Sequence, residues 1–175
     1  MPSEKKVKDL MIPITEYSTV PVDALVQDAI KMLMGALNQS GAHRSVVVVD
    51  EQGDVMGILT LRDLIKALEP RSLDPDAVRG SISWLVENTD PGVYPEGQFT
   101  QRSKLEAKKT VREVMGKLYL ITIGDEAPLL KAVHIMLQNN VGSLPVLRDG
   151  KLVGMIRISE IFQEIGNIIC APEGG

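Results

Sequence analysis

The sequence predicts an α+β fold in which two pseudo-symmetric β-α-β-β-α repeats pack together as one module. A short charged segment that ends in methionine occurs twice, as Val7–Met11 and Val111–Met115. A segment with glycines at both ends also occurs twice, as Gly53–Gly57 and Gly150–Gly154. Strand-like and helix-like segments follow one another in the same order in both halves. Such internal similarity indicates a duplicated unit, here of roughly 60 residues, a size that is marginal alone and is stabilised by packing on its twin.

In the first repeat, a short helix is expected over residues 7–12. It should end before Pro13, because a residue that precedes proline avoids helical dihedral angles. Residues 18–22 predict a short edge strand. Residues 23–34 repeat apolar side chains at helical spacing, and Asp23 is suited to the start of that helix.

A hairpin should complete the sheet of the first repeat. The valine run Val46–Val49 predicts a strand that is buried on both faces. Residues 55–59 predict its antiparallel partner, and residues 64–68 a following helix. So small a set of strands is not stable by itself, and the two repeats must therefore pack sheet and helix faces against each other.

The second repeat should contain the same elements. Residues 120–123 predict its first strand and residues 129–137 an amphipathic helix, with Pro128 suited to the first helical turn. A hairpin is expected from residue 143 onward, and apolar residues within 161–165 predict a closing amphipathic helix.

These assignments divide the chain into repeat 1 at residues 7–68, a long inter-repeat insertion at 69–110, and repeat 2 at 111–170. A connection of this length usually has a function, and it contains half of the aromatic residues, among them Trp84. Trp84 either covers the edge of the core of the module or belongs to an interaction surface, since aromatic side chains are favoured as interface anchors.

Composition excludes several classes of function. The chain of 175 residues has a formal net charge of −4 and no Lys/Arg run, which is a poor basis for nucleic-acid binding. Its first residues are charged and no apolar run approaches the ~20 residues of a membrane span, so we expect a soluble cytoplasmic protein. Two histidines and one cysteine leave few parts for a metal site, a disulfide or nucleophilic catalysis, and we do not expect an enzyme.

Thr60 and Asp63 lie where the hairpin of repeat 1 leads into a helix. One interpretation is a capping box, with Thr60 at the N-cap and the Asp63 carboxylate turned back to the N-cap amide. The other is a ligand site, in which Thr60 and free backbone amides meet a phosphate while Asp63 accepts hydrogen bonds from the hydroxyls of a ribose. The two roles are compatible.

The ordered set of features resembles the CBS domain, which occurs in tandem pairs called Bateman modules. The resemblance rests on the charged segment ending in Met, the helix, the hairpin and the motif Gly-apolar-x-Thr-x-x-Asp, and it covers about residues 7–68 and 111–165. It implies a stand-alone CBS domain-containing protein that senses AMP, ADP, ATP or S-adenosylmethionine in clefts between the repeats. The resemblance also implies that no further cofactor is required and that two chains form a disc-like homodimer.

The resemblance also assigns roles to individual residues. It places the adenine base near the first strand, the ribose at the motif aspartate, and the phosphates at the motif threonine and at basic residues before the valine strand. The candidate ligand contacts are therefore Tyr17, Thr19, His43, Arg44, Thr60 and Asp63.

The second repeat departs from this motif. Arg157 replaces the threonine and Glu160 the aspartate. Glu160 is one methylene longer, which changes the geometry that a ribose would meet. Arg157 either binds phosphate or fills the cleft and pairs with an acid such as Glu160, so a weaker second site is expected here.

A different class of function remains open. The chain could be a ligand-free interaction module that docks a partner enzyme or transporter through the 69–110 insertion. Saturable nucleotide binding separates the two hypotheses, and so does the effect of Asp63→Ala on that binding.

Overall fold

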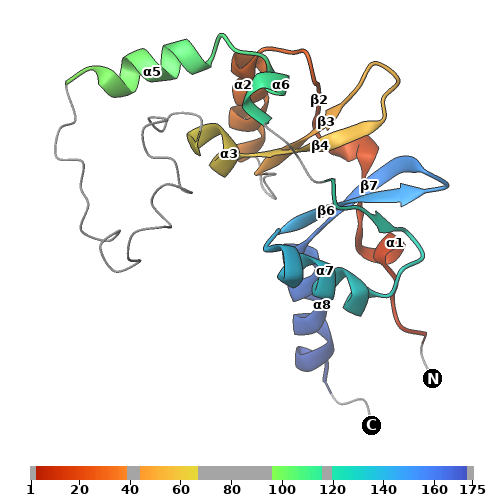
Figure 1. Cartoon of the computed structure of the whole chain (residues 1–175). Coiled ribbons are helices and arrows are strands. Elements are labelled where there is room, and N and C mark those ends of the chain that lie inside the picture. The colour runs from red at the N-terminus through yellow and green to blue at the C-terminus, as the bar shows by residue number, and fades with distance from the viewer. Residues whose placement is uncertain (1–2, 39–43, 67–95, 116–119, 173–175) are drawn as a thin grey trace, which may run out of the picture.

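The computed structural model describes residues 3–38, 44–66, 96–115 and 120–172 and has the expected α+β architecture (Figure 1). Two small sheets lie in two lobes, each covered by helices. In the first part of the chain the elements are α1 (Val7–Leu10), β1 (Ile12–Pro13), the 3-10 helix η1 (Ile14–Glu16), β2 (Thr19–Pro21), α2 (Val26–Leu37), β3 (Ser45–Val49), β4 (Val55–Thr60) and α3 (Leu61–Lys66).

After one additional helix, the second part of the chain repeats this order, without described counterparts of β1 and η1. Its elements are α5 (Gln98–Glu106), α6 (Val111–Met115), β5 (Ile123–Gly124), α7 (Leu129–Asn139), β6 (Ser143–Arg148), β7 (Lys151–Arg157) and α8 (Ile158–Cys170). None of the described helices is both long and apolar enough to cross a membrane.

Each lobe is built on a hairpin extended by a parallel strand. In the first lobe the order is β2-β3-β4, with β2 parallel to β3. In the second lobe the order is β1-β7-β6-β5, with β5 parallel to β6. The strand β1 belongs to the first repeat in sequence but pairs with β7 through Ile12 and Met155. The sheet of repeat 2 therefore includes a strand of repeat 1.

The valine strand forms the core of the first lobe, as its sequence predicts. Val46, Val47 and Val48 are 0% exposed.

The hairpin of the second lobe turns through Asp149 and Gly150, both of which have positive φ. That geometry suits a two-residue turn between twisted strands.

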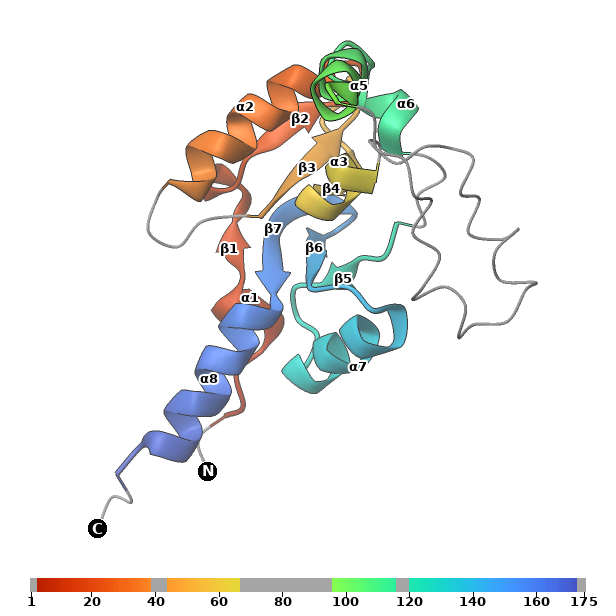
Figure 2. The ribbon, with the colours of Figure 1, turned by 90° about the vertical axis from the view of Figure 1, so that its left-hand side faces the viewer.

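The lead-in helix α1 packs in the lobe of the other repeat. Val7 is fully buried in a cluster with Ile123 and Ala132 of repeat 2. The Val7 amide donates to Ala127 O at 3.0 Å, and the Lys8 amide donates to Asp125 O at 2.9 Å. Figures 1 and 2 show α1 beside β7 and α7, away from the helices of repeat 1.

The second lead-in helix, α6, makes the reciprocal contact. Val111 is fully buried in the core of the first lobe, beside Val20 and Leu33. The Val111 amide donates to Ala24 O at 2.8 Å, and the Arg112 amide donates to the carbonyl of Val22 at 2.9 Å. The two repeats thus exchange their lead-in helices, and neither core is complete without the other repeat.

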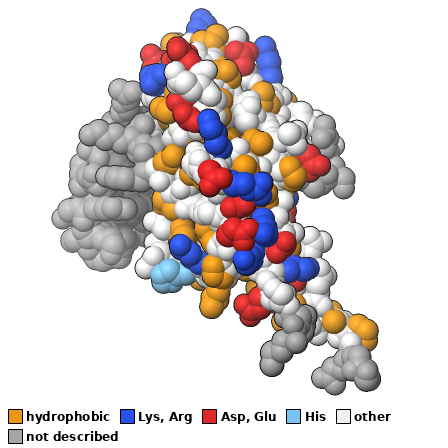
Figure 3. Space-filling view, turned by 90° about the vertical axis from the view of Figure 1, so that its right-hand side faces the viewer, with side chains coloured by type: hydrophobic (Ala, Val, Ile, Leu, Met, Phe, Trp, Pro, Cys, Tyr) orange, Lys and Arg blue, Asp and Glu red, His pale blue; other side chains and the backbone are white. Residues whose placement is uncertain are grey.

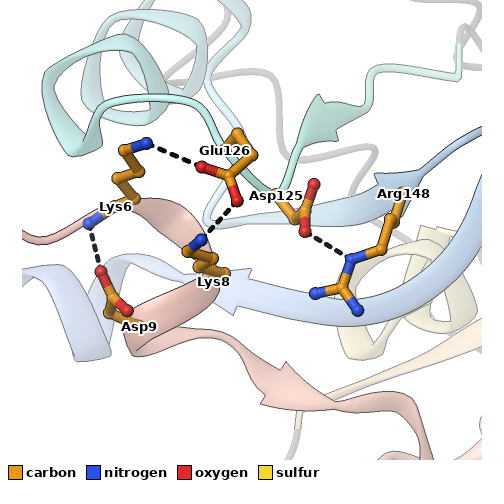
Figure 4. A network of polar contacts seen from close by, with 6 residues as sticks. All are labelled: Lys6, Lys8, Asp9, Asp125, Glu126 and Arg148. Atoms are coloured by element: carbon orange, nitrogen blue, oxygen red, sulfur yellow. Dashed lines mark hydrogen bonds and ion pairs between the residues drawn. The ribbon is translucent and has the colours of Figure 1, made fainter.

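Charged side chains reinforce the docking of α1 (Figure 4). Lys6 Nζ lies 2.7 Å from a carboxylate oxygen of Glu126, and Lys8 forms an ion pair with the other oxygen. These two lysines, through hydrogen bonds first and their charges second, lower the pKa of Glu126 to about 2. Arg148 Nε lies 2.6 Å from Asp125 Oδ2 in the same region.

On the face shown in Figure 3, Lys and Arg side chains lie in one mixed band with Asp and Glu side chains. Acidic and basic groups there are interleaved, so this face offers no extended positive patch to a phosphate backbone.

Helix α2 begins at Val26 rather than at Asp23, and no side chain caps it. Its first amides are satisfied by backbone instead: Val26 N donates to Lys109 O at 2.8 Å and Gln27 N donates to Ala107 O at 3.1 Å. The described end of the inter-repeat insertion therefore holds the start of α2. Most of the insertion, including Trp84, lies outside the described residues.

Candidate functional site

A cleft of about 480 Å³ lies between the two repeats. One wall comes from β4 and α3 of repeat 1, and the other from the chain before β5 and from the start of β6 in repeat 2. The volume lies within the about 300–1,000 Å³ that is usual for small-molecule sites. The lining residues from repeat 1 are Gly57, Ile58, Thr60, Arg62, Asp63 and Lys66, and those from repeat 2 are residues 120–121 and 140–145.

Thr60 and Asp63 line this cleft and also form a capping box at the start of α3. Asp63 Oδ2 accepts hydrogen bonds from Thr60 N at 2.9 Å and from Thr60 Oγ1 at 2.7 Å. The Asp63 amide donates to Thr60 Oγ1 at 3.2 Å. Among the described residues no hydrogen bond is made to Asp63 Oδ1, so capping leaves one half-buried carboxylate oxygen available at the cleft.

The opposite wall is largely apolar. Leu120, Ile121, Val141, Leu144 and Pro145 all border the cleft. An apolar slot facing a carboxylate suits a ligand with a flat apolar part and a hydroxylated part.

Arg44 lies beside the motif, whereas His43 lies outside the described residues. The carbonyl of Arg44 accepts a hydrogen bond from Leu61 N at 3.3 Å, and the neighbouring Ser45 pairs with Thr60 across the hairpin. The Arg44 side chain is exposed at the end of β3 that approaches the cleft.

Tyr17 and Thr19 do not line the cleft that contains Thr60 and Asp63. Tyr17 is buried, and its hydroxyl lies 2.5 Å from Ser45 Oγ. Burial raises the pKa of that hydroxyl above its ordinary value, and the hydrogen bond to Ser45 opposes the rise. Thr19 is a half-buried member of β2 that pairs with Val47.

Tyr17 packs instead in a cluster with Met155 of β7, two residues before Arg157. The charges of Arg157 and Glu160 also affect the pKa of its hydroxyl. The sequence-based prediction grouped Tyr17 with Thr60 and Asp63 because it combined the first strand and the motif of one repeat. In the structure Thr60 and Asp63 face residues 120–121 of repeat 2 across the cleft.

Arg157 and Glu160 form a close pair at that second position. Arg157 Nε lies 3.0 and 2.9 Å from the two carboxylate oxygens of Glu160, and Arg157 Nη2 makes a further short contact. Burial raises the pKa of Glu160, but the hydrogen bond and the charge of Arg157 outweigh it, and the net direction is downward. The hydrogen bond to Glu160 raises the pKa of Arg157.

Sequence reasoning missed the lining residues from repeat 2, such as Leu120 and Ile121. It also missed Arg62 and Lys66 on α3. Residues 120–121 fall in the predicted first strand of repeat 2, but their place opposite Thr60 and Asp63 depends on long-range packing, for which the sequence carries no local signal. In the described residues no group of three or more His, Cys, Asp or Glu side chains is placed to hold a metal ion.

Comparison with known proteins identifies the architecture. The chain is 33% identical over 145 residues to a CBS domain-containing protein of Dictyostelium discoideum, covering 82% of this chain and 81% of that protein. The fold resembles the CBS domain pair of protein MJ0100 in complex with 5′-methylthioadenosine and S-adenosyl-L-methionine, with a TM-score of 0.64, 20% identity and coverage of 95% and 99%.

A second solved structure, CBSX2 in complex with AMP, matches with a TM-score of 0.61 and 20% identity, over 94% of this chain and 98% of that one. The family model described as the CBS domain matches residues 7–70 and 111–167. The chain therefore belongs to the CBS domain family and contains two copies of the domain.

Proposed function

We propose that this protein is a regulatory sensor that binds an adenine nucleotide or a related adenosyl ligand in the cleft between its repeats. The observation that carries the proposal is the cleft in which Thr60 and Asp63 of repeat 1 face the apolar residues Leu120 and Ile121 of repeat 2. The base would lie in the apolar slot, and Asp63 Oδ1 would accept from the ribose hydroxyls. Since both repeats line one site, a bound ligand would change how they pack.

Relatives of the same fold support this ligand class. One is a complex with AMP and another a complex with 5′-methylthioadenosine and S-adenosyl-L-methionine. All three ligands contain adenosine, which has a flat base and a ribose. Those two chemical features match the two walls of this cleft.

The thermal stability of the purified protein tests the proposal directly. A ligand that binds only the folded state stabilises it by about 2.7 kcal/mol at a hundredfold excess over the dissociation constant. We expect at least one of AMP, ADP, ATP and S-adenosylmethionine to raise the melting temperature at millimolar concentration. No shift with any of them would favour the ligand-free interaction module.

A matched pair of variants separates binding from capping. Asp63→Ala removes the capping carboxylate of α3 together with the ribose contact. Glu113→Ala removes the equivalent carboxylate of α6, where Thr110 N donates to Glu113 Oε2 at 2.9 Å, outside the cleft. Both should cost about 0.5–2 kcal/mol of stability, but only Asp63→Ala should abolish the ligand shift. If the ligand raised the melting temperature of both variants equally, Asp63 would act only as a helix cap.

We also propose that the protein is a homodimer formed through α7 and α8. Apolar side chains are exposed along this surface, including Leu137 at 69%, Phe162 at 74% and Ile169 at 74%. Leu137 and Phe162 border a groove of about 220 Å³ whose described lining residues are all apolar. A continuous apolar stripe of this kind is unfavourable in water and favours burial against a second copy.

Sedimentation or light scattering of Phe162→Glu tests the dimer. We expect this variant to be monomeric at concentrations where the unmodified chain is dimeric, and Phe99→Glu on α5 to leave the dimer intact. A monomeric unmodified chain would contradict the proposal.

We further propose that the protein is cytoplasmic and has no enzymatic activity, and that a partner enzyme or transporter receives its signal.

A further inference from the structure

Two cations border the cleft beside the motif. Arg62 and Lys66 lie on α3, both are exposed, and both line the cleft. Residues four positions apart lie on the same helical face, about 6 Å apart along the axis. Like charges at this spacing destabilise a helix slightly, so folding does not account for the pair.

No described residue neutralises these cations. Neither Arg62 nor Lys66 forms an ion pair with any described carboxylate. Among the described lining residues Asp63 is the single acid, and its Oδ2 accepts hydrogen bonds from Thr60. The described part of the wall from repeat 2 contains no charged side chain, so two cations and one carboxylate give the described lining a formal charge of +1.

The second repeat offers an internal comparison. Ser159 and Gln163 occupy the positions that correspond to Arg62 and Lys66. The two cations are therefore confined to the cleft that contains the intact Thr60–Asp63 motif. A general preference for basic residues on this helix would have placed them in both repeats.

We infer that the cleft selects phosphorylated adenosine ligands over S-adenosylmethionine, and that Arg62 and Lys66 set this choice by charge. The inference rests on the proposed function, which leaves both ligand classes open. Arg62 and Lys66 flank Asp63 on α3, so the group attached to a ribose held at Asp63 lies within their field. A nucleotide presents phosphates there, which both cations bind, whereas S-adenosylmethionine presents a sulfonium cation at the same ribose carbon and has a net charge of +1, which they repel.

Calorimetric titration of five ligands tests the selectivity: adenosine, AMP, ADP, ATP and S-adenosylmethionine. Affinity should rise with the number of phosphates, and S-adenosylmethionine should bind at least about tenfold more weakly than ADP, given the usual strength of charge-assisted hydrogen bonds. Raising salt from ~0.1 M to ~1 M shortens the screening length from about 10 Å to about 3 Å. This change should weaken ATP binding and leave adenosine binding unchanged.

A charge-matched pair of double variants identifies the residues responsible. Arg62→Gln with Lys66→Gln should weaken ATP binding about tenfold or more, leave adenosine within about twofold, and remove the discrimination against S-adenosylmethionine. Lys31→Gln with Lys131→Gln changes the net charge equally, on α2 and α7 and outside the lining of the cleft. This control should behave as the unmodified protein.

The outcomes separate this inference from the proposed function. If adenosine or S-adenosylmethionine binds as tightly as ATP, and Asp63→Ala abolishes that binding, the sensor proposal stands and the charge selectivity is refuted. Equal losses in the two double variants would also refute it. If none of the five ligands binds, the proposed function and this inference both fail.

Discussion

Arg157 and Glu160 occupy the positions that Thr60 and Asp63 hold in the first repeat, and this difference explains why the two motif positions should not bind a ligand equally well. The Arg157 guanidinium engages both oxygens of Glu160. A ribose at this place would have to displace that half-buried pair. Breaking it leaves a carboxylate without its partner, at a cost of about 1–3 kcal/mol.

Restoring the motif should create a second site. In the double variant Arg157→Thr with Glu160→Asp, we expect calorimetric titration to give two ligands per chain instead of one, because the replacement reproduces the residues of the first motif. Arg157→Ala alone should lower stability without adding a site. A stoichiometry of one in the double variant would contradict the claim that Arg157 and Glu160 prevent binding at this position.

Gly154 allows two backbones to approach closely. A Cβ at this position would lie 2.5 Å from Ile12 O and 2.9 Å from the sulfur of Met11. Gly154→Ala should therefore force β1 away from β7 and cost about 1–3 kcal/mol, measured by denaturant unfolding. Gly166→Ala, on α8 where a Cβ meets nothing within 4 Å, should be neutral or stabilising by up to about 1 kcal/mol. The account of β1 pairing is contradicted if the two variants have the same stability.

Among the elements, α1 depends on charge as well as on the burial of Val7. The pKa of Glu126 is lowered to about 2 from 4.5 because Lys6 and Lys8 bind its carboxylate. A carboxylate whose pKa is lower in the folded state stabilises the fold above its unfolded pKa and loses that contribution as the pH falls through the folded value. The contribution should be present above about pH 4.5 and fade toward about pH 2.

Thermal melts of Glu126→Gln across this pH range test the contact. The variant should melt below the unmodified protein at neutral pH, and the two melting temperatures should converge as the pH approaches about 2. High salt should reduce the difference, because the ion pairs are exposed and screened. A difference that is independent of pH would rule out this role of Glu126.

The sequence predicted the existence and order of the elements well, because the periodicity of residues 23–34 and the valine run at 46–49 are local signals. It could not predict that Val7 and Val111 exchange cores. The two lead-in segments have similar sequences, so their sequences do not show which lobe each one joins. That choice depends on long-range packing. For the same reason the sequence found Thr60 and Asp63 but paired them with Tyr17 rather than with Ile121.

At the scale of the whole molecule, this exchange predicts one cooperative unit. Val7→Ala and Val111→Ala each remove a fully buried side chain from the lobe of the opposite repeat. Each should cost about 1–3 kcal/mol and shift one single unfolding transition. Leu130→Ala, at a side chain that is 78% exposed, should change stability by no more than about 0.5 kcal/mol. Two separate transitions, with each variant shifting only one, would refute the interlocked architecture.

Calorimetric titration of ATP and ADP into the unmodified protein and into Asp63→Ala shows whether the inter-repeat cleft is the ligand site. We expect saturable binding of one nucleotide per chain in the unmodified protein. We expect loss of that binding in Asp63→Ala, while Glu113→Ala, with its similar loss of a helix cap, binds normally. Absence of binding at millimolar nucleotide, or binding that survives Asp63→Ala unchanged, would contradict the assignment of the inter-repeat cleft as the ligand site.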